Sequence, residues 1–341
     1  MLKKKIIIWI IAVVAAMGIL LALSAVLPNV SGNDGKPEYL LIRNNASFTD
    51  VLDSLHTKKS LRSVLAFEIN ARLLGYPAKI HGGRYELSPG INNFRLLNRL
   101  MKGRQTPVQL SFNNIRTKEQ FAKRIAGQLE MEASELLVLL NDNYMLGEYG
   151  FDSLTVAAMF IPNTYEFYWT VAPAGFFVKM HSEYEKFWNE TRRKKAEEIG
   201  LGLIEVSTLA SIVEEETNLA SEKPIVAGLY LNRLHKGMLL QADPTVKFAL
   251  GDFGIKRVLF KHIDDSRNSS YNTYTHKGLP PGPIRLPSIE SIDAVLNYEA
   301  NPYFFMCAKG SGGQGHDFAV TFAEHLKNAE RYRKEMDRLH Y

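Results

Sequence analysis

The chain has very little cysteine, and none of the spacings that cysteine and histidine show in metal sites. Cys307 is the single cysteine in 341 residues, which excludes an internal disulfide. It follows the apolar residues Tyr303, Phe305 and Met306, so we expect a thiol packed in the core. Neither a C-x-x-C pair nor a zinc-type Cys/His pattern occurs. The sequence therefore predicts no metal site and no cofactor.

A phosphate-binding loop and a strong charge bias are also missing. The glycine-rich run GSGGQG at residues 310–315 lacks the Lys-Ser/Thr ending of a P-loop. A net charge of +5, with no long basic run outside residues 192–195, is too weak to indicate nucleic acid binding. It suits a surface that works near an anionic polymer or a membrane. The apolar content of 46% allows a sizeable core in one domain or two.

Only one long uncharged run is present, at the N-terminus. Residues 6–27 would span about 33 Å as a helix, which matches the hydrocarbon core of a bilayer. Lys3, Lys4 and Lys5 precede it and predict a cytoplasmic N-terminus, residues 1–5. We therefore expect a single-pass inner-membrane protein with its body on the extracytoplasmic, periplasmic side. The alternative is a signal peptide cleaved near Ser24.

The chain after the apolar run predicts an α+β protein in two parts. Residues 28–37 form a polar linker with turn residues. Residues 38–105 follow the order strand, helix, helix, strand, helix, which is compatible with a small LysM-type peptidoglycan-binding module or with an ordinary α+β packing domain. Residues 106–341 form a larger mixed α+β domain. The elements expected in the small module are 39–42, 47–55, 61–74, 83–87 and 92–101.

Within the larger part, helical and loop patterns alternate. Residues 179–201 read as one long polar helix with a solvated outer face. Residues 222–234 form an amphipathic helix, and residues 241–245 (QADPT) break the helical pattern as a loop. Residues 271–284, YNTYTHKGLPPGPI, cannot be helical because three prolines and two glycines force extended or turn geometry. A polar loop of restricted flexibility is a typical wall of a site.

One glutamate in the run EEE is directed inward by helical geometry. We expect a helix that begins at an N-cap Ser207 and continues through Leu209. At 100° per residue, Glu216 lies about 20° from the direction of Leu209, inside the apolar stripe. Glu214 and Glu215 point about 120–140° away, towards solvent. Burial raises a carboxyl pKa, so Glu216 is a candidate general acid.

Two simpler interpretations of Glu216 remain open at this point. The three glutamates could form an ordinary charged helix face. Glu216 could instead be buried in an ion pair with Arg233 or Lys236.

Five short motifs follow one another along the second part of the chain: ASIVEEET (210–217), NRL (232–234), LQADPTV (240–246), YNTYTHKGLPPGPI (271–284) and HDF (316–318). In this order they resemble the motifs of the endolytic murein transglycosylases of the YceG-like family, and the resemblance covers residues 80 to the C-terminus. The middle residue of the E-x-E-T motif varies in that family, so Glu215 receives no role.

The resemblance implies cleavage of the MurNAc–GlcNAc bond in nascent glycan strands, leaving 1,6-anhydro-MurNAc ends. Glu216 would be the catalytic residue, acting first as general acid and then as base. The resemblance also implies that polymerising peptidoglycan synthases are partners. The substrate-binding residues carried over are Glu214, Asn232, Gln241, Asp243, Thr245, Asn272, Tyr274, Leu279, Pro280, His316 and Phe318.

Two other functions compete with this one. A hydrolysing muramidase would use Glu216 as acid and Asp243 as base or nucleophile. A non-catalytic scaffold would bind the wall without cleaving it. The mass of the product ends distinguishes hydrolysis from lytic cleavage. A Glu216→Gln variant that keeps its cellular function would indicate the scaffold.

Overall fold

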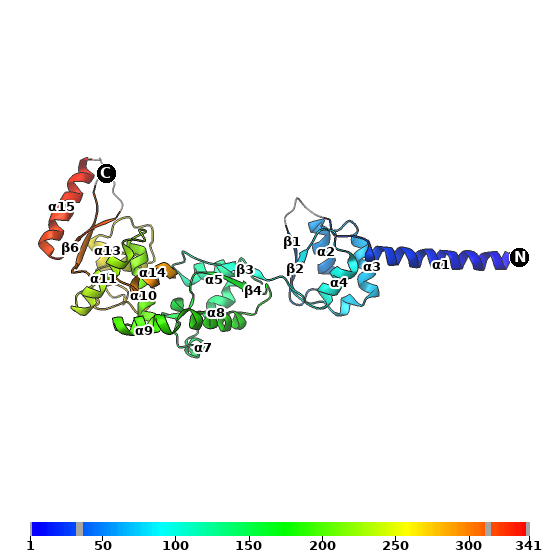
Figure 1. Ribbon diagram of the computed structural model, residues 1–341, viewed down its shortest axis with the longest axis horizontal. Helices are drawn as coiled ribbons and strands as arrows, with labels where there is room; N and C mark the ends of the chain where they lie inside the picture. The colour runs from blue at the N-terminus through cyan, green and yellow to red at the C-terminus, as the bar shows by residue number, and fades with distance from the viewer. Residues whose placement is uncertain (1, 32–36, 311–314, 339–341) are drawn as a thin grey trace. The chain divides into compact units, whose positions relative to one another are not determined.

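The computed structural model describes residues 2–31, 37–310 and 315–338, and its backbone contacts divide the chain into two units. Residues 32–36 of the predicted linker and residues 311–314 of the glycine-rich run lie outside the described residues. The mixed α+β class is confirmed, since helices alternate with short two-stranded sheets (Figure 1). Unit 1 comprises Met1–Leu110, Ala126–Met131 and Tyr165–Ala172, and unit 2 comprises Ser111–Ile125, Glu132–Thr164 and Pro173–Tyr341.

Unit 1 begins with the long helix α1 (Leu2–Val26). Residues 3–26 are long and apolar enough to cross a membrane by length and composition, and their surface is exposed. The residues directly after α1 also pack into unit 1, since Asn29 and Val30 are buried there. The backbone N–H of Val30 donates to the carbonyl of Ile91 over 3.1 Å.

The rest of unit 1 follows the predicted order of strand, helix, helix, strand and helix. Strands β1 and β2 pair antiparallel, with Glu38 opposite Leu87 and Ile42 opposite Gly83. Ser47 caps α2 in a capping box with Asp50, which satisfies backbone N–H groups at the start of the helix. The likeness to a LysM module stays a prediction. The elements are β1 (Glu38–Ile42), α2 (Phe48–Lys58), α3 (Val64–Leu73), β2 (Gly83–Leu87) and α4 (Asn93–Met101).

The predicted single helix over residues 179–201 is wrong, because two helices occupy this stretch. α8 (Pro173–Phe187) ends before the buried Trp188, and α9 (Glu190–Ile199) begins after Asn189. The side chain of Asn189 accepts the N–H of Arg192 and so caps a new helix start. α8 is not a solvated helix either, since it buries residues such as Phe176.

The helix that carries the three glutamates begins earlier than predicted. α10 (Leu203–Glu216) has Gly202 at its N-cap, and the carboxylate of Glu205 accepts the N–H of Gly202 over 2.7 Å. Ser207 is therefore not the cap but a buried residue inside the helix. All residues from 206 to 213 are buried, so α10 is enclosed on every side.

The elements that follow α10 build the site. The predicted loop at residues 241–245 is shorter than expected, because Pro244 occupies the first turn of α12 and fixes a helical φ there. Residues 271–284 contain no helix, as predicted. The elements are α11 (Lys223–His235), α12 (Asp243–Leu250), α14 (Ile289–Leu296), β5 (Phe305–Ala308), β6 (His316–Ala319) and α15 (Phe322–Arg338).

Cys307 is not the fully packed thiol that the sequence predicts. β5 pairs with β6 antiparallel, Phe305 opposite Ala319, and its residues are only partly buried. A two-stranded sheet covered by one helix leaves a face open, and that face borders the cavity described next.

Candidate active site

A cavity of about 370 Å³ in unit 2 gathers five of the predicted site residues. Its walls come from the C-terminal end of α10, from α11, from the segment before α12, and from β5 and α15. The five residues are Glu216, Gln241, Asp243, Tyr274 and His316.

Glu216 ends α10 with its carboxyl at this cavity. Its Oε1 accepts the hydroxyl of Tyr230 from α11 over 2.6 Å. Burial raises the pKa of Glu216 from its ordinary 4.5 to about 7, the hydrogen bond from Tyr230 lowers it, and the negative charge of Asp243 raises it. The residue remains partly accessible, so the carboxyl is surrounded by protein yet open to the cavity. A carboxyl in this state can donate a proton near neutral pH.

No ion pair to Glu216 occurs among the described residues. Arg233, the partner considered from the sequence, instead donates to backbone carbonyls. Its Nε lies 2.6 Å from the carbonyl of Phe304, and its Nη1 lies 2.8 Å from that of Leu240. Among the smaller influences, the positive charges of Lys247 and then Arg233 still lower the pKa of Glu216. Arg233 thereby joins α11 to β5 and to the segment before α12.

Asp243 and Tyr274 also line this cavity and are held together. The Tyr274 hydroxyl donates to Asp243 Oδ1 over 2.5 Å. Thr273 positions this pair, because its carbonyl accepts the N–H of Gln241 over 3.1 Å and its hydroxyl accepts the N–H of Ala242 over 3.0 Å. The proline-rich loop is therefore fastened to the start of α12, which brings Tyr274 to Asp243.

Gln241 has a left-handed backbone conformation with a φ of 52°. A residue with a side chain adopts this conformation at a cost of about 1–3 kcal/mol, and such residues are concentrated at functional sites. The hydrogen bond to Thr273 and the helix start at Asp243 hold the strained residue in place. Its side chain consequently lines the cavity.

His316, which lines the cavity, is held by a buried glutamate, Glu222, that lies outside the sequence motifs. Glu222 accepts the backbone N–H of His316 over 2.7 Å, and its Oε2 lies 2.9 Å from His316 Nδ1. The hydroxyl of Thr217 donates to the same carboxylate over 3.1 Å. Burial alone would raise the pKa of Glu222, but these hydrogen bonds hold it below the ordinary value. Gly315 fits here because a Cβ would lie 2.2 Å from Glu222 Oε1.

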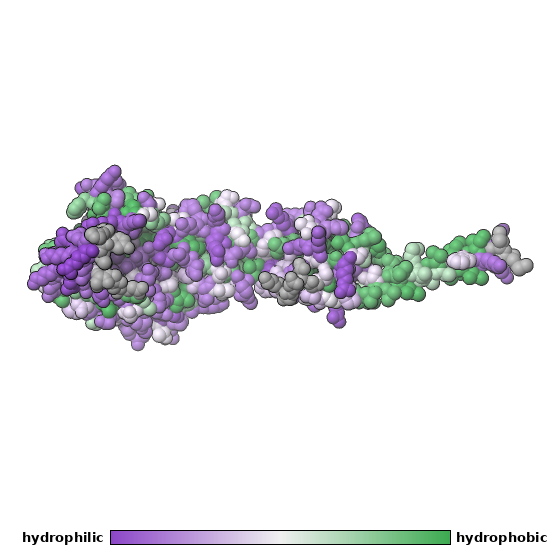
Figure 2. Space-filling model, turned by 90° about the horizontal axis from the view of Figure 1, so that it is seen from above, coloured by the Kyte–Doolittle hydropathy of each residue, from purple (hydrophilic) through white to green (hydrophobic). Residues whose placement is uncertain are grey.

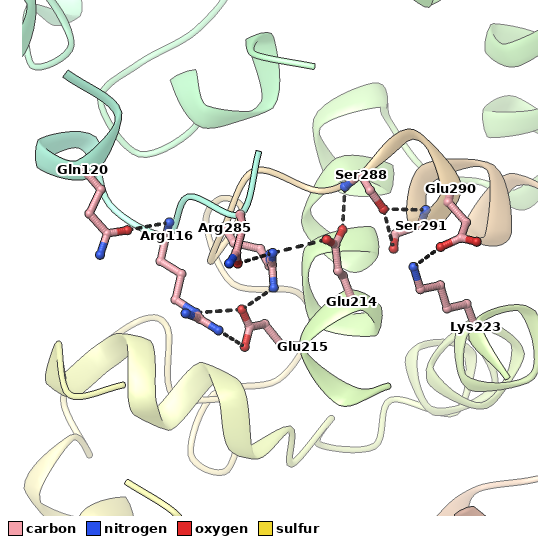
Figure 3. A network of polar contacts seen from close by, with 10 residues as sticks. Arg116, Gln120, Glu214, Glu215, Lys223, Arg285, Ser288, Glu290 and Ser291 are labelled. Carbon is pink, nitrogen blue, oxygen red and sulfur yellow. Dashed lines mark hydrogen bonds and ion pairs between the residues drawn. The ribbon is translucent and has the colours of Figure 1, made fainter. Parts of the chain in front are cut away.

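Glu214 and Glu215 do not point to solvent, which corrects the helical-wheel prediction. Arg116 binds Glu215 with two hydrogen bonds of 2.8 and 3.0 Å, and Arg285 bridges Glu215 and Glu214 at 2.7 and 3.2 Å (Figure 3). The N–H of Ser288 also donates to Glu214. The wheel predicted exposure because it assumes one solvated face, whereas α10 is enclosed and its outer carboxylates meet arginines from other segments.

The remaining predicted residues lie outside the cavity lining. Asn272 is fully buried, and its side-chain amide donates to the carbonyl of Ile263 over 2.9 Å. Thr245 is also buried and hydrogen-bonds with Thr273, with 2.8 Å between their hydroxyl oxygens. The other residues of this group are Glu214, Asn232, Leu279, Pro280 and Phe318.

Sequence reasoning missed Tyr230, Glu222 and the cavity lining from β5 and α15. Tyr230 stands in a predicted amphipathic helix, but nothing in that pattern says which neighbour its hydroxyl meets. Within the described ranges, no three His, Cys, Asp or Glu side chains are grouped as a metal site.

Comparisons with known proteins agree with the motifs. The sequence model of the YceG-like family matches residues 40–331. The endolytic murein transglycosylase of Bacillus subtilis is 26% identical over 307 residues, which are 85% of this chain and 83% of that protein. The endolytic murein transglycosylase of Streptococcus pneumoniae is 30% identical over 130 residues, 38% of this chain and 23% of that protein. A crystal structure of a YceG-like protein from Listeria monocytogenes matches 85% of this chain and 98% of its own, with 26% identity and a TM-score of 0.57.

Proposed function

Because this chain belongs to the YceG-like family, we propose that it is a membrane-anchored endolytic transglycosylase of peptidoglycan. It cleaves the MurNAc–GlcNAc bond of glycan strands and leaves 1,6-anhydro-MurNAc ends. The observation that carries the proposal is the state of Glu216, whose carboxyl faces the cavity and has a pKa of about 7.

Glu216 performs both proton transfers of the reaction. Its carboxyl first protonates the glycosidic oxygen as the bond from that oxygen to C1 of MurNAc breaks. The C6 hydroxyl of the same sugar then forms a new bond to C1 and gives its proton to the Glu216 carboxylate. The enzyme is thereby regenerated, and no water is consumed. A pKa near 7 suits a group that must give a proton and then take one at neutral pH.

The other cavity residues position the sugar and stabilise the acid form of Glu216. The negative charge of Asp243 favours the protonated carboxyl. Gln241, Tyr274 and His316 offer amide, hydroxyl and imidazole groups to the hydroxyls and amides of the strand. Asn232, Thr245 and Asn272 act on the substrate indirectly, through the walls that they hold. Glu214, Leu279, Pro280 and Phe318 lie outside the lining of this cavity.

The helix α1 is the membrane anchor in this proposal, and the two units lie on the extracytoplasmic side. Three lysines before the apolar run favour this orientation. An anchored enzyme works on strands as they emerge at the membrane, so association with peptidoglycan synthases is part of the proposal.

Mass spectrometry of the products tests the reaction. Purified full-length protein in detergent is incubated with uncrosslinked glycan strands, and the Glu216→Gln variant serves as the matched control. Anhydro ends from the wild-type chain alone support the proposal. Ends that carry one added water would identify a hydrolysing muramidase, the alternative in which Asp243 is base or nucleophile. If the strands stay intact with the wild-type protein and with Glu216→Gln, and both proteins bind the strands, the protein is a wall-binding scaffold.

A further inference from the structure

Helices α3 and α4 of unit 1 pack against each other, and each exposes apolar side chains, together called the α3–α4 face below. Leu65 and Leu73 on α3 are 66% and 67% exposed, and Phe94 on α4 is 53% exposed. Ile69 lies between the two leucines at a spacing of four residues, so the three share one side of α3. Single exposed apolar residues are common, whereas a group of them marks an interaction surface.

This face lies next to the end of α1. The side-chain amide of Asn70 on α3 donates to the Ser24 hydroxyl over 2.8 Å, and that of Asn93 on α4 donates to the Ser24 carbonyl over 2.9 Å. Asn70 is one helical turn from Leu73, and Asn93 directly precedes Phe94. The helices that carry the apolar residues are therefore hydrogen-bonded to the final turn of α1. Figure 2 shows hydrophobic surface that continues from α1 onto the adjoining part of the rest of unit 1.

Cationic side chains lie beside the α3–α4 face. Arg95 and Arg104 are exposed and, with Arg99, line a hollow of about 430 Å³. The loop at residues 88–91 forms another wall of this hollow, and the carbonyl of Ile91 accepts the N–H groups that follow α1. Guanidinium groups next to an apolar surface match the phosphates and acyl chains of anionic phospholipids.

We propose that the α3–α4 face lies on the surface of the lipid bilayer that α1 crosses. Leu65, Leu73 and Phe94 enter the boundary between headgroups and acyl chains, and the arginine hollow faces lipid phosphates. The α3–α4 face adjoins the last turn of α1, and this argues for the bilayer and against a protein partner. If α1 crosses the membrane, its last turn lies at the lipid surface, and so does the face next to it. The inference rests on the membrane anchor of the proposed function and adds an orientation of unit 1 on the membrane.

Depth-dependent quenching tests the orientation. A Cys307→Ser chain receives one new cysteine, at Leu73, at Ile11 in α1, or at Asn45, and an environment-sensitive fluorophore is attached. Asn45 is the matched control in unit 1, since it precedes α2, which is about 16 Å long, whereas Ser60, just beyond the other end of α2, accepts the N–H of Ser31 near the end of α1. Each chain is reconstituted in vesicles of phosphatidylglycerol and phosphatidylethanolamine, with ordinary or brominated acyl chains.

We expect brominated lipid to remove most of the emission at Ile11 and Leu73 and little at Asn45. Glu substitutions at Leu65 and Phe94 should restore the Leu73 emission, and both positions are exposed, so the fold tolerates them. Quenching at Ile11 without quenching at Leu73 would overturn the inference and leave the anchor intact. Absence of quenching at Ile11 would overturn the anchor itself. Equal quenching at Leu73 and Asn45 would also overturn a specific orientation.

Discussion

Glu214 and Glu215 differ from Glu216 in their partners, although the three residues follow one another at the end of α10. Two arginines neutralise the first two carboxylates, and the backbone of Ser288 adds a donor (Figure 3). Glu216 receives a single hydroxyl group, from Tyr230, and faces a cavity.

The comparison shows how one turn of helix carries two kinds of carboxylate. Ion pairs fasten the helix end to the segments that hold Arg116 and Arg285. The neighbouring carboxyl has no cation within pairing distance in the described part of the chain, so burial dominates and its pKa rises to about 7. The rigid pairs thus hold the acid in place without neutralising it.

The largest expected effect is the difference in cleavage rate between a Glu216 variant and a Glu215 variant. Glu216→Gln removes the proton donor and should lower the rate of strand cleavage about 10²- to 10⁴-fold. Glu215→Gln should retain most of the rate at a temperature where the protein stays folded, because Glu215 lies outside the cavity. Product formation per unit time measures both. Equal losses in the two variants would contradict the division of roles.

The next effect tests the structural half of the comparison. Arg285→Leu removes a buried cation from two partly buried carboxylates, which should lower the free energy of unfolding by about 3–5 kcal/mol. The control is Arg72→Leu, which breaks an exposed pair with Glu68 and should cost less than about 1 kcal/mol. Urea unfolding followed by circular dichroism measures both changes, in unit 2 for Arg285 and in unit 1 for Arg72.

The raised pKa of Glu216 predicts a stability difference that depends on pH. The folded carboxyl titrates near 7 and the unfolded one near 4.5, so its favourable contribution is complete below 4.5 and lost as pH rises through 7. Between pH 5 and pH 8, the wild-type chain should lose on the order of 2–3 kcal/mol relative to Glu216→Gln. Urea unfolding of both chains at the two pH values measures it. A constant difference would mean that the folded pKa is not raised.

The smallest effect concerns the single hydroxyl on Glu216. Tyr230→Phe removes a hydrogen bond that lowers the pKa of Glu216, so the alkaline limb of the rate profile should move to higher pH, by roughly one pH unit. Tyr274→Phe removes a hydroxyl bound to Asp243 instead and provides the matched control. A shift of the limb to lower pH in Tyr230→Phe would contradict the assigned direction.

Much of the site follows from local sequence. Helical periodicity placed Glu216 on the inner side of α10, and the prolines at residues 280, 281 and 283 required a non-helical wall. The motif order brought Gln241, Asp243, Tyr274 and His316 into one set, and the structure collects these four with Glu216 around one cavity. The start of α10 was misplaced because the Gly202–Glu205 cap lies in a stretch that reads as the end of a polar helix.

What the sequence determined by itself is the inward direction of Glu216 and the non-helical loop at residues 271–284, since periodicity and chain breaks are properties of short segments. The other site residues came from the resemblance to the YceG-like family. The tertiary structure alone decided which partner each residue meets. Glu214 and Glu215 were expected in water, yet arginines 70 and about 100 residues away in the chain neutralise them. Tyr230 on Glu216 and Glu222 on His316 likewise arise from the packing of α11 against α10 and β6. A pKa depends on burial and on charges across such contacts, which no local pattern encodes.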